Sequence, residues 1–351
     1  MARRLSRRIV FGSVLGAVVL LGGLAVPSIQ RFRRLDSIRD ALQARDLATA
    51  YALLNDHLLR EPTDSEAELD AARTARRLDD FDAADRHLKR YESLGGSSEE
   101  IRLERRLRGS QAGSLDGASG ALKFCADHPD HPSTALMIEA LSRGFLAAGQ
   151  PVRAREAIEL WLKRDPPVAD RAYATALRGR SLEMQADVPA AIADYRASLA
   201  MDPRSDDARF ALAEILSRES PAEARPLYEE LLNKAYRSFE VRLGFVRCLR
   251  QLGELDRAAA KVAELKRERG EFVPVRVEAA RIALEQGRAA DAEADLVFAL
   301  ERAPRDRDAH VQMVRCLRDL GREADARKWI ERLTALDAEL FRNLPSTGTK
   351  P

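Results

Sequence analysis

Arginine recurs along this chain at one position of a repeated pattern, and it is the residue type best placed to do chemistry. Seven of nine equivalent positions hold Arg, although only 50 of the 351 residues are Arg. These seven residues, called here the arginine column, are Arg39, Arg73, Arg143, Arg180, Arg247, Arg281 and Arg315. A guanidinium group binds a carboxylate through two parallel hydrogen bonds. The column therefore predicts a surface that grips an acidic peptide, a C-terminal carboxylate or an acidic polymer.

The opposite interpretation is a solvated helix face on which these arginines pair with acids of their own helix. Six of them have an Asp or Glu three or four residues away, which puts both side chains on one helical face, and for Arg315 this acid, Asp319, follows a second arginine, Arg318. Each such pair stabilises a helix by only about 0.2–0.5 kcal/mol, yet it neutralises the charge of the arginine. Arg247 has no such acid. The residues predicted to keep the most charge are therefore Arg247 and Arg250, with Arg315 and Arg318 two repeats later.

Histidine and cysteine residues offer little sign of a reactive site. His128 and His131 are close in sequence, but neighbouring prolines predict a loop and no third ligand follows, so we expect no metal site. Cys248 and Cys316 occupy equivalent places two repeats apart and are predicted to be small core residues. The chain has no nucleotide-binding loop, zincin helix or nucleophile elbow. We expect no enzyme activity and no cofactor.

The pattern that carries the arginines is a repeat of about 34 residues. An alanine follows each column position by eleven residues, at intervals of 33 to 37 residues. The nine alanines are Ala50, Ala84, Ala118, Ala154, Ala191, Ala224, Ala258, Ala292 and Ala326. A small side chain at a fixed place in each unit lets one helix approach another closely, so these alanines are predicted to lie at helix contacts.

Each unit has the apolar spacing of two amphipathic helices joined by a short turn. In residues 275–284 the apolar side chains recur at i, i+4, i+5 and i+8, which predicts a first helix. Gly287 then supplies a turn residue that tolerates positive φ. Apolar residues from Ala292 to Leu300 predict a second helix, and Pro304 ends it.

This pattern resembles the tetratricopeptide repeat, which has the same period and whose unit is an antiparallel helix pair. The resemblance rests on Gly179, Ala191, Tyr195, Ser198 and Pro203 in one unit, and on Ala280, Ala292, Leu296, Ala299 and Pro304 in another. It covers about residues 31–340 and implies an all-α, right-handed superhelical solenoid of about nine units. It further implies that each unit contacts only its neighbours, that first helices line the concave face, and that this face binds a peptide or a partner helix.

Two stretches depart from the repeat. Residues 99–132 contain four glycines, and Arg106 stands there at the usual place of a small residue, so this unit is predicted to be loose, bent or mobile. Extra residues at 165–168 lengthen one turn between units, and a second bend is expected there.

The N-terminal segment is typical of a membrane anchor. Residues 9–26 carry no charge and contain enough apolar residues to cross about 30 Å of hydrocarbon as a helix. Four arginines precede this stretch and three follow it, a balance that slightly favours a cytoplasmic N-terminus and repeats on the outer side. A small-residue triplet ending at Ala25 also allows cleavage before Val26 and an exported form.

Composition limits the classes of partner. Residues 1–34 contain seven arginines and no acid, whereas in residues 35–351 the acidic side chains slightly outnumber the basic ones. The basic character belongs to the leader, so it gives no support to nucleic-acid binding. Three cysteines are too few for a disulfide framework or a four-cysteine zinc site.

We therefore predict three segments: an anchor at residues 1–30, a solenoid at 31–340 and a C-terminal tail at 341–351. The predicted function is that of a membrane-tethered scaffold that binds protein partners, acidic segments among them, in bacterial cell-envelope assembly or secretion. The alternative, from a different class, is a regulatory subunit of a membrane enzyme or envelope-biogenesis complex, with its repeats in the cytoplasm. A protease-accessibility assay separates the two.

Overall fold

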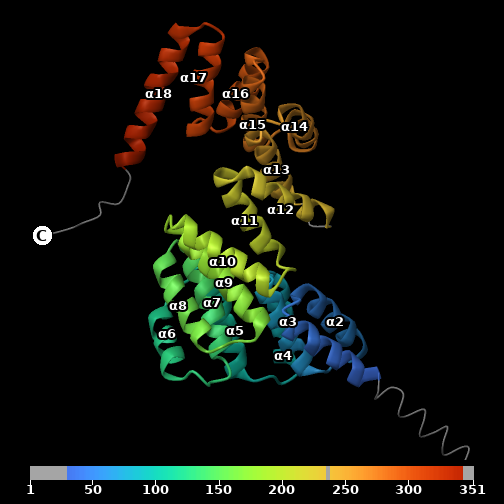
Figure 1. Ribbon diagram of the computed structural model, residues 1–351. Coiled ribbons are helices and arrows are strands. Elements are labelled where there is room, and N and C mark those ends of the chain that lie inside the picture. The colour runs from blue at the N-terminus through green and yellow to red at the C-terminus, as the bar shows by residue number, and fades with distance from the viewer. Residues whose placement is uncertain (1–29, 235–237, 343–351) are drawn as a thin grey trace, which may run out of the picture. The chain divides into compact units, whose positions relative to one another are not determined.

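Helices and turns make up the part of the chain that the computed structural model describes, residues 30–234 and 238–342, and no strand occurs there. The helices alternate as the first and second helices of nine repeats (Figure 1). The first helices are 30–43, α3 (Ser65–Arg77), α5 (Ser98–Gln111), α7 (Thr134–Ala147), α9 (Val168–Met184), α11 (Asp206–Glu219), α13 (Phe239–Gln251), α15 (Val273–Glu285) and α17 (Arg307–Asp319). The second helices are α2 (Leu47–Arg60), α4 (Phe81–Ser93), α6 (Ala118–Asp127), α8 (Pro151–Lys163), α10 (Val188–Met201), α12 (Pro221–Asn233), α14 (Leu255–Arg269), α16 (Ala289–Arg302) and α18 (Glu323–Arg342).

The repeated alanines explain how each pair closes. All nine lie on second helices, and each is between 0% and 7% exposed. Around them pack larger apolar side chains, such as Leu296 and Met313 near the C-terminus and Phe145 and Trp161 nearer the N-terminus. The prediction that these alanines mark helix contacts is confirmed.

Polar caps and left-handed turns fix the ends of the helices. Asp64, Asp80 and Asp306 accept hydrogen bonds from backbone amides of the first turns of α3, α4 and α17, as N-cap residues do. In most pairs the turn between the two helices contains one residue with positive φ. In the last three pairs that residue is glycine, as at Gly287, where a side chain would strain the backbone.

The chain divides into two compact units, an N-terminal unit up to Asp202 and a C-terminal unit from Pro203. The N-terminal unit contains the first five helix pairs and the C-terminal unit the last four. The boundary therefore lies at a place where the sequence predicted no bend. At the expected bend, residues 165–168, α8 still packs on α9.

The third repeat is open, in agreement with the prediction that it is the loosest. Among the described residues, α5 makes little contact with its own second helix, α6, and packs instead against α7. Gly144 allows that close approach, because a Cβ atom there would collide with the carbonyl oxygen of Ser110. Helix α6 also packs against α7.

The predicted anchor (residues 9–26) lies outside the described residues, as does most of the predicted tail (341–351). Within residues 30–234 and 238–342, no helix is both long enough and apolar enough to cross a bilayer.

Candidate partner-binding site

The arginine column lies on the first helices, as the repeat predicts. Its members are on helix 30–43 and on α3, α7, α9, α13, α15 and α17. In the C-terminal unit, successive first helices pack on one another, α11 on α13, α13 on α15 and α15 on α17. Successive second helices show no comparable packing among the described residues. The stack therefore curves toward its first helices, which places that part of the column on the inner side of the curve.

Two column arginines bridge neighbouring repeats. Arg73 donates to Glu100 and, at 3.0 Å, to Glu104 on the next first helix. Arg281 makes the equivalent bond to Asp308, at the same interval along the chain as Glu100 from Arg73. These side chains are partly buried, and their charge is satisfied within the chain.

Arg250 was predicted to be one of the least neutralised arginines, and this prediction is wrong. Its guanidinium donates to Glu278 at 2.7 Å and to Glu285 at 2.8 Å, both on the first helix of the following repeat. The same bridge joins Arg76 to Glu104 in the N-terminal unit, again across one repeat. The prediction considered acids on the same helix only, whereas the partners come from the adjacent repeat.

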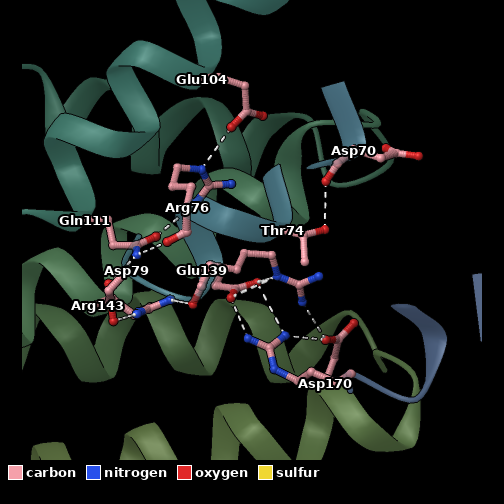
Figure 2. Close-up of polar contacts among 11 residues, drawn as sticks. Asp70, Thr74, Arg76, Asp79, Glu104, Gln111, Glu139, Arg143 and Asp170 are labelled. Carbon is pink, nitrogen blue, oxygen red and sulfur yellow. Dashed lines mark hydrogen bonds and ion pairs between the residues drawn. The ribbon is translucent and has the colours of Figure 1, made fainter. Parts of the chain in front are cut away.

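Arg143 does not face an open surface. It donates to the backbone carbonyl of Arg77 at 2.7 Å and to the carboxylate of Asp79, both near the turn of the second repeat (Figure 2). Gln111 donates to the same Asp79 at 2.6 Å. Arg143 therefore ties α7, in the fourth repeat, to the turn of a repeat that is not its neighbour.

A second link of this kind surrounds Glu139 on α7. Arg45, from the turn of the first repeat, donates to Glu139 and, at 2.6 Å, to Asp170 on α9. Arg77 also bonds both carboxylates, and Figure 2 shows the dashed bonds that reach Glu139 and Asp170. The guanidinium of Arg45 lies 3.6 Å from the centroid of the Tyr173 ring. We call Arg45, Arg77, Glu139 and Asp170 the closing cluster.

The closing cluster corrects the expectation that each repeat contacts only its neighbours, because it joins the first two repeats to the fourth and fifth. The side chains of Arg45 and Glu139 are 8% and 3% exposed. Burial by itself raises the pKa of Glu139, but the charges of Arg45 and Arg77 outweigh it and hold the pKa of this carboxyl well below its usual range. The ionised carboxylate is therefore part of the native structure.

The remaining column arginines are the most accessible. Arg39 is 62% exposed and contacts Asp36 at 3.4 Å, and Arg180 is exposed on α9. Arg247 is 37% exposed with its closest carboxylate, Glu214, at 3.6 Å. Arg315 is 49% exposed and lies 3.9 Å from Asp319.

A sequence signal separates these groups, although it was not used in the prediction. Five column arginines are followed 27 residues later by an acid, the position that bonds Arg73 and Arg281. Arg247 and Arg315 are followed at that interval by Pro274 and Arg342. These two therefore lack the carboxylate that would bridge them to the next repeat.

The other candidate residues have structural positions. The thiols of Cys248 and Cys316 donate to carbonyl oxygens of the preceding second helices, at 3.3 and 3.2 Å, and burial raises their pKa to about 11. The prediction of core cysteines is confirmed. His128 stacks on Phe124 and His131 meets the edge of the same ring. Among the described residues, no group of His, Cys, Asp and Glu side chains could hold a metal ion.

The comparisons with known proteins agree with this architecture. Profiles described as tetratricopeptide repeat match residues 283–344 and, in three overlapping segments, residues 139–271, which together exceed half of the chain. No curated protein sequence matches the chain.

Solved structures of repeat proteins are similar to this chain at low sequence identity. PilW, described as a widely conserved type IV pilus biogenesis factor, is 20% identical over 58% of this chain and 94% of its own, with a TM-score of 0.52. A tetratricopeptide repeat protein from Parabacteroides merdae ATCC 43184 is 15% identical over 82% of this chain and 98% of its own, with a TM-score of 0.42. YrrB, a repeat protein described as having an unusual peptide-binding site, is 19% identical over 54% of this chain and 96% of its own, with a TM-score of 0.44.

An all-helical array of nine such pairs is a repeat solenoid. This chain belongs to the tetratricopeptide repeat family.

Proposed function

We propose that this chain is a membrane-tethered scaffold that binds an acidic segment of a protein partner through Arg247 and Arg315, in a cell-envelope assembly or secretion process. The supporting observation is the missing bridge at these two arginines. Both stand on the inner side of the C-terminal unit, yet the closest carboxylates among the described residues lie 3.6 Å from Arg247 and 3.9 Å from Arg315. Their guanidinium groups can therefore take carboxylates of a partner, which bind arginine in paired hydrogen bonds.

The neighbouring charges favour the same surface. Arg318 is exposed one turn after Arg315, and Arg281 lies on the helix between the two arginines in chain order. Arg281 is bonded to Asp308, so it borders this surface but is not one of the two arginines proposed to bind the partner. A partner with two or more acidic side chains would meet Arg315 and Arg318 together, and repeat solenoids commonly bind extended partners along such a surface.

Charge reversal tests the proposal. Cells expressing the full chain with Arg247→Glu and Arg315→Glu are crosslinked at low and moderate salt, and the partners recovered from membranes are compared with those of the wild type. We expect one acidic partner to be lost, and its recovery from the wild type to fall as salt rises. Arg327→Glu is the matched control, because it reverses an exposed arginine on α18. An unchanged partner set in the double variant contradicts the proposal.

The membrane tether and the side of the membrane belong to the same proposal. Their basis is the uncharged stretch at residues 9–26. Extraction of membranes with carbonate should leave the chain in the pellet, and deletion of residues 9–26 should release it. Protease added outside spheroplasts should cleave the repeats. Protection of the repeats would favour the alternative, a cytoplasmic regulatory subunit.

A further inference from the structure

The open third repeat contains a cavity of about 1120 Å³ between α5, α6 and the start of α7. Its apolar wall is formed by Leu103 and Leu107 of α5, Phe124 of α6, and Met137 and Leu141 of α7. We call this space the α5–α6 groove. It occupies the place where a first helix and a second helix pack together in the neighbouring repeats, such as α3 with α4 and α7 with α8.

Arg106 explains why the pair stays open. In the fifth repeat the equivalent residue is Gly179, where a Cβ atom would lie only 3.1 Å from the Tyr195 ring. The equivalent residues of the second and eighth repeats are Ala72 and Ala280, both buried. A long cation at this position cannot be buried between two helices without a partner. Arg106 is exposed and lines the groove, and it makes no hydrogen bond or ion pair with any residue in the described ranges.

The charged wall of the groove is basic along α5. Arg102 and Arg106 are one turn apart on the helix, so their Cα atoms lie about 6 Å from each other along its axis. Arg102 donates to the hydroxyl of Ser98 at 3.3 Å, and Arg105 contacts the exposed Glu92 at 3.1 Å.

Carboxylates also border the groove, but they do not neutralise this wall. Glu100 is bonded to Arg73, and among the described residues no ion pair joins Glu99, in the first turn of α5, to Arg102 or Arg106. Asp116 stands in the turn before α6. The middle of α5 therefore presents positive charge beside the apolar wall of the groove.

We propose that the α5–α6 groove binds an acidic amphipathic helix of a partner protein. Apolar side chains at i, i+3 and i+4 of such a helix would cover the wall around Leu103 of α5 and Phe124 of α6. These two helices leave that wall open because they make little contact with each other. Carboxylates one turn apart would match the spacing of Arg102 and Arg106. The site is separate from the surface around Arg247 and Arg315, and it does not depend on the function proposed for that surface.

The composition of the chain favours a foreign occupant over one of its own segments. Residues 1–29, 235–237 and 343–351, which lie outside the described residues, contain no Asp or Glu. None of these segments brings a carboxylate side chain to Arg102 and Arg106.

The probe is a labelled synthetic peptide of about 16 residues, long enough to hold a helix when bound. It carries leucines at i, i+3, i+4 and i+7, with glutamates beside this stripe. Its twin has lysine in place of every glutamate. Binding to the full-length chain is measured by fluorescence anisotropy. We expect the acidic peptide to bind at least about tenfold more tightly than the basic twin, with an affinity that falls as salt rises.

Three variants locate the binding. Arg102→Glu with Arg106→Glu should weaken the acidic peptide about tenfold or more. Ala121→Trp should fill the groove from α6 and abolish binding. Arg86→Glu, an exposed charge reversal on α4, is the matched control and should leave binding unchanged. Circular dichroism at 222 nm checks that each variant keeps its helices.

Arg106→Ala gives a second, independent test. It restores the small residue of Ala72 and Ala280, so α6 can close on α5, and it should lose peptide binding while the melting temperature holds or rises. Arg106→Lys keeps a long cation and should retain binding. Retained binding in Arg106→Ala and Ala121→Trp overturns the proposal.

Other outcomes would assign the groove differently. Equal binding of the acidic and basic peptides, or loss of the acidic peptide only in Arg247→Glu with Arg315→Glu, also overturns the proposal. A dimer of the wild type that Ala121→Trp converts to a monomer would mean that a second copy fills the groove. That result would overturn the proposal of an acidic partner helix. Failure of the crosslinking experiment above leaves this test unaffected, because the two experiments use different arginines.

Discussion

The two units differ in how far along the chain their ion pairs reach. In the C-terminal unit, ion pairs such as Arg250–Glu278 and Arg281–Asp308 join one repeat to the next. In the N-terminal unit the same kind of bridge occurs, but Arg45 also reaches residues 94 and 125 positions away. A line of helix pairs held by neighbours alone can flex along its length. In the N-terminal unit, the turn of the first repeat is bonded to α9, the first helix of the fifth repeat. This unit cannot open without breaking that bond.

The turn residues show where this difference begins in the sequence. In the C-terminal unit, Gly253, Gly287 and Gly321 take the left-handed turn conformation at little cost. In the N-terminal unit, Arg45 and Asp79 take the same conformation with φ of 54° and 64°. A side chain there costs about 1 kcal/mol or more. Both residues use that side chain to contact α7.

Breaking the closing cluster should give the largest effect and should be confined to the N-terminal unit. Glu139→Gln leaves Arg45 and Arg77 buried beside a neutral group, so we expect a loss of about 3 kcal/mol in the stability of this unit. The two tryptophans separate the units, since Trp161 lies beside Arg45 and Trp329 belongs to the C-terminal core. Urea unfolding is therefore followed in a Trp329→Phe background for the first unit and a Trp161→Phe background for the second.

Glu278→Gln is the matched control for that experiment, because Glu278 is also buried and bonded to two arginines. It should destabilise the C-terminal unit and leave the Trp161 signal unchanged. Hydrogen exchange near residues 45 and 79 should accelerate in Glu139→Gln only. Equal exchange in both variants would mean that the closing cluster does not hold the turns in place.

Gly144→Ala should destabilise the N-terminal unit by about 2–3 kcal/mol, because its Cβ would meet a backbone carbonyl that cannot turn away. Gly120→Ala is the control on α6, where a Cβ would have nothing within 4 Å. An alanine in that helix should leave stability unchanged or raise it by up to about 1 kcal/mol. If both substitutions were neutral, α5 and α7 would not be packed as closely as described. The measurement is urea unfolding followed by Trp161 fluorescence.

The helix pairs could be predicted from sequence because the repeat fixes them locally. The nine alanines recur at intervals of 33 to 37 residues, Cys248 and Cys316 occupy equivalent places, and all of these residues are buried in the structure. The closing cluster could not be predicted in this way, because Arg45 and Glu139 belong to different repeats and no spacing relates them. The useful signal was indirect: a charged residue, Arg45 or Asp79, stands where most later repeats have glycine.

Acid should weaken the N-terminal unit through Glu139. Its carboxyl has a lower pKa in the folded chain than the usual value of about 4.3, so the unfolded state takes up a proton first as the pH falls. The stability that this group contributes is complete above that value and is lost below it. Between about pH 4.5 and pH 3 we expect the wild type to lose about 1.5 kcal/mol more than Glu139→Gln. A constant difference between the two chains across this range would mean that Glu139 is not ionised in the folded state.

Arg315→Ala should have the smallest effect on stability, within about 0.5 kcal/mol, because its closest carboxylate among the described residues is 3.9 Å away and both groups are well exposed. The equivalent Arg281 is partly buried and bonded to Asp308, so Arg281→Ala should cost more, about 1–2 kcal/mol. Urea unfolding followed by Trp329 fluorescence compares them directly. A small loss of stability in Arg315→Ala would mean that the Arg315 side chain is not needed for folding and is available to bind a partner. If Arg315→Ala cost as much as Arg281→Ala, Arg315 would be part of the scaffold, and the partner surface would have to lie elsewhere.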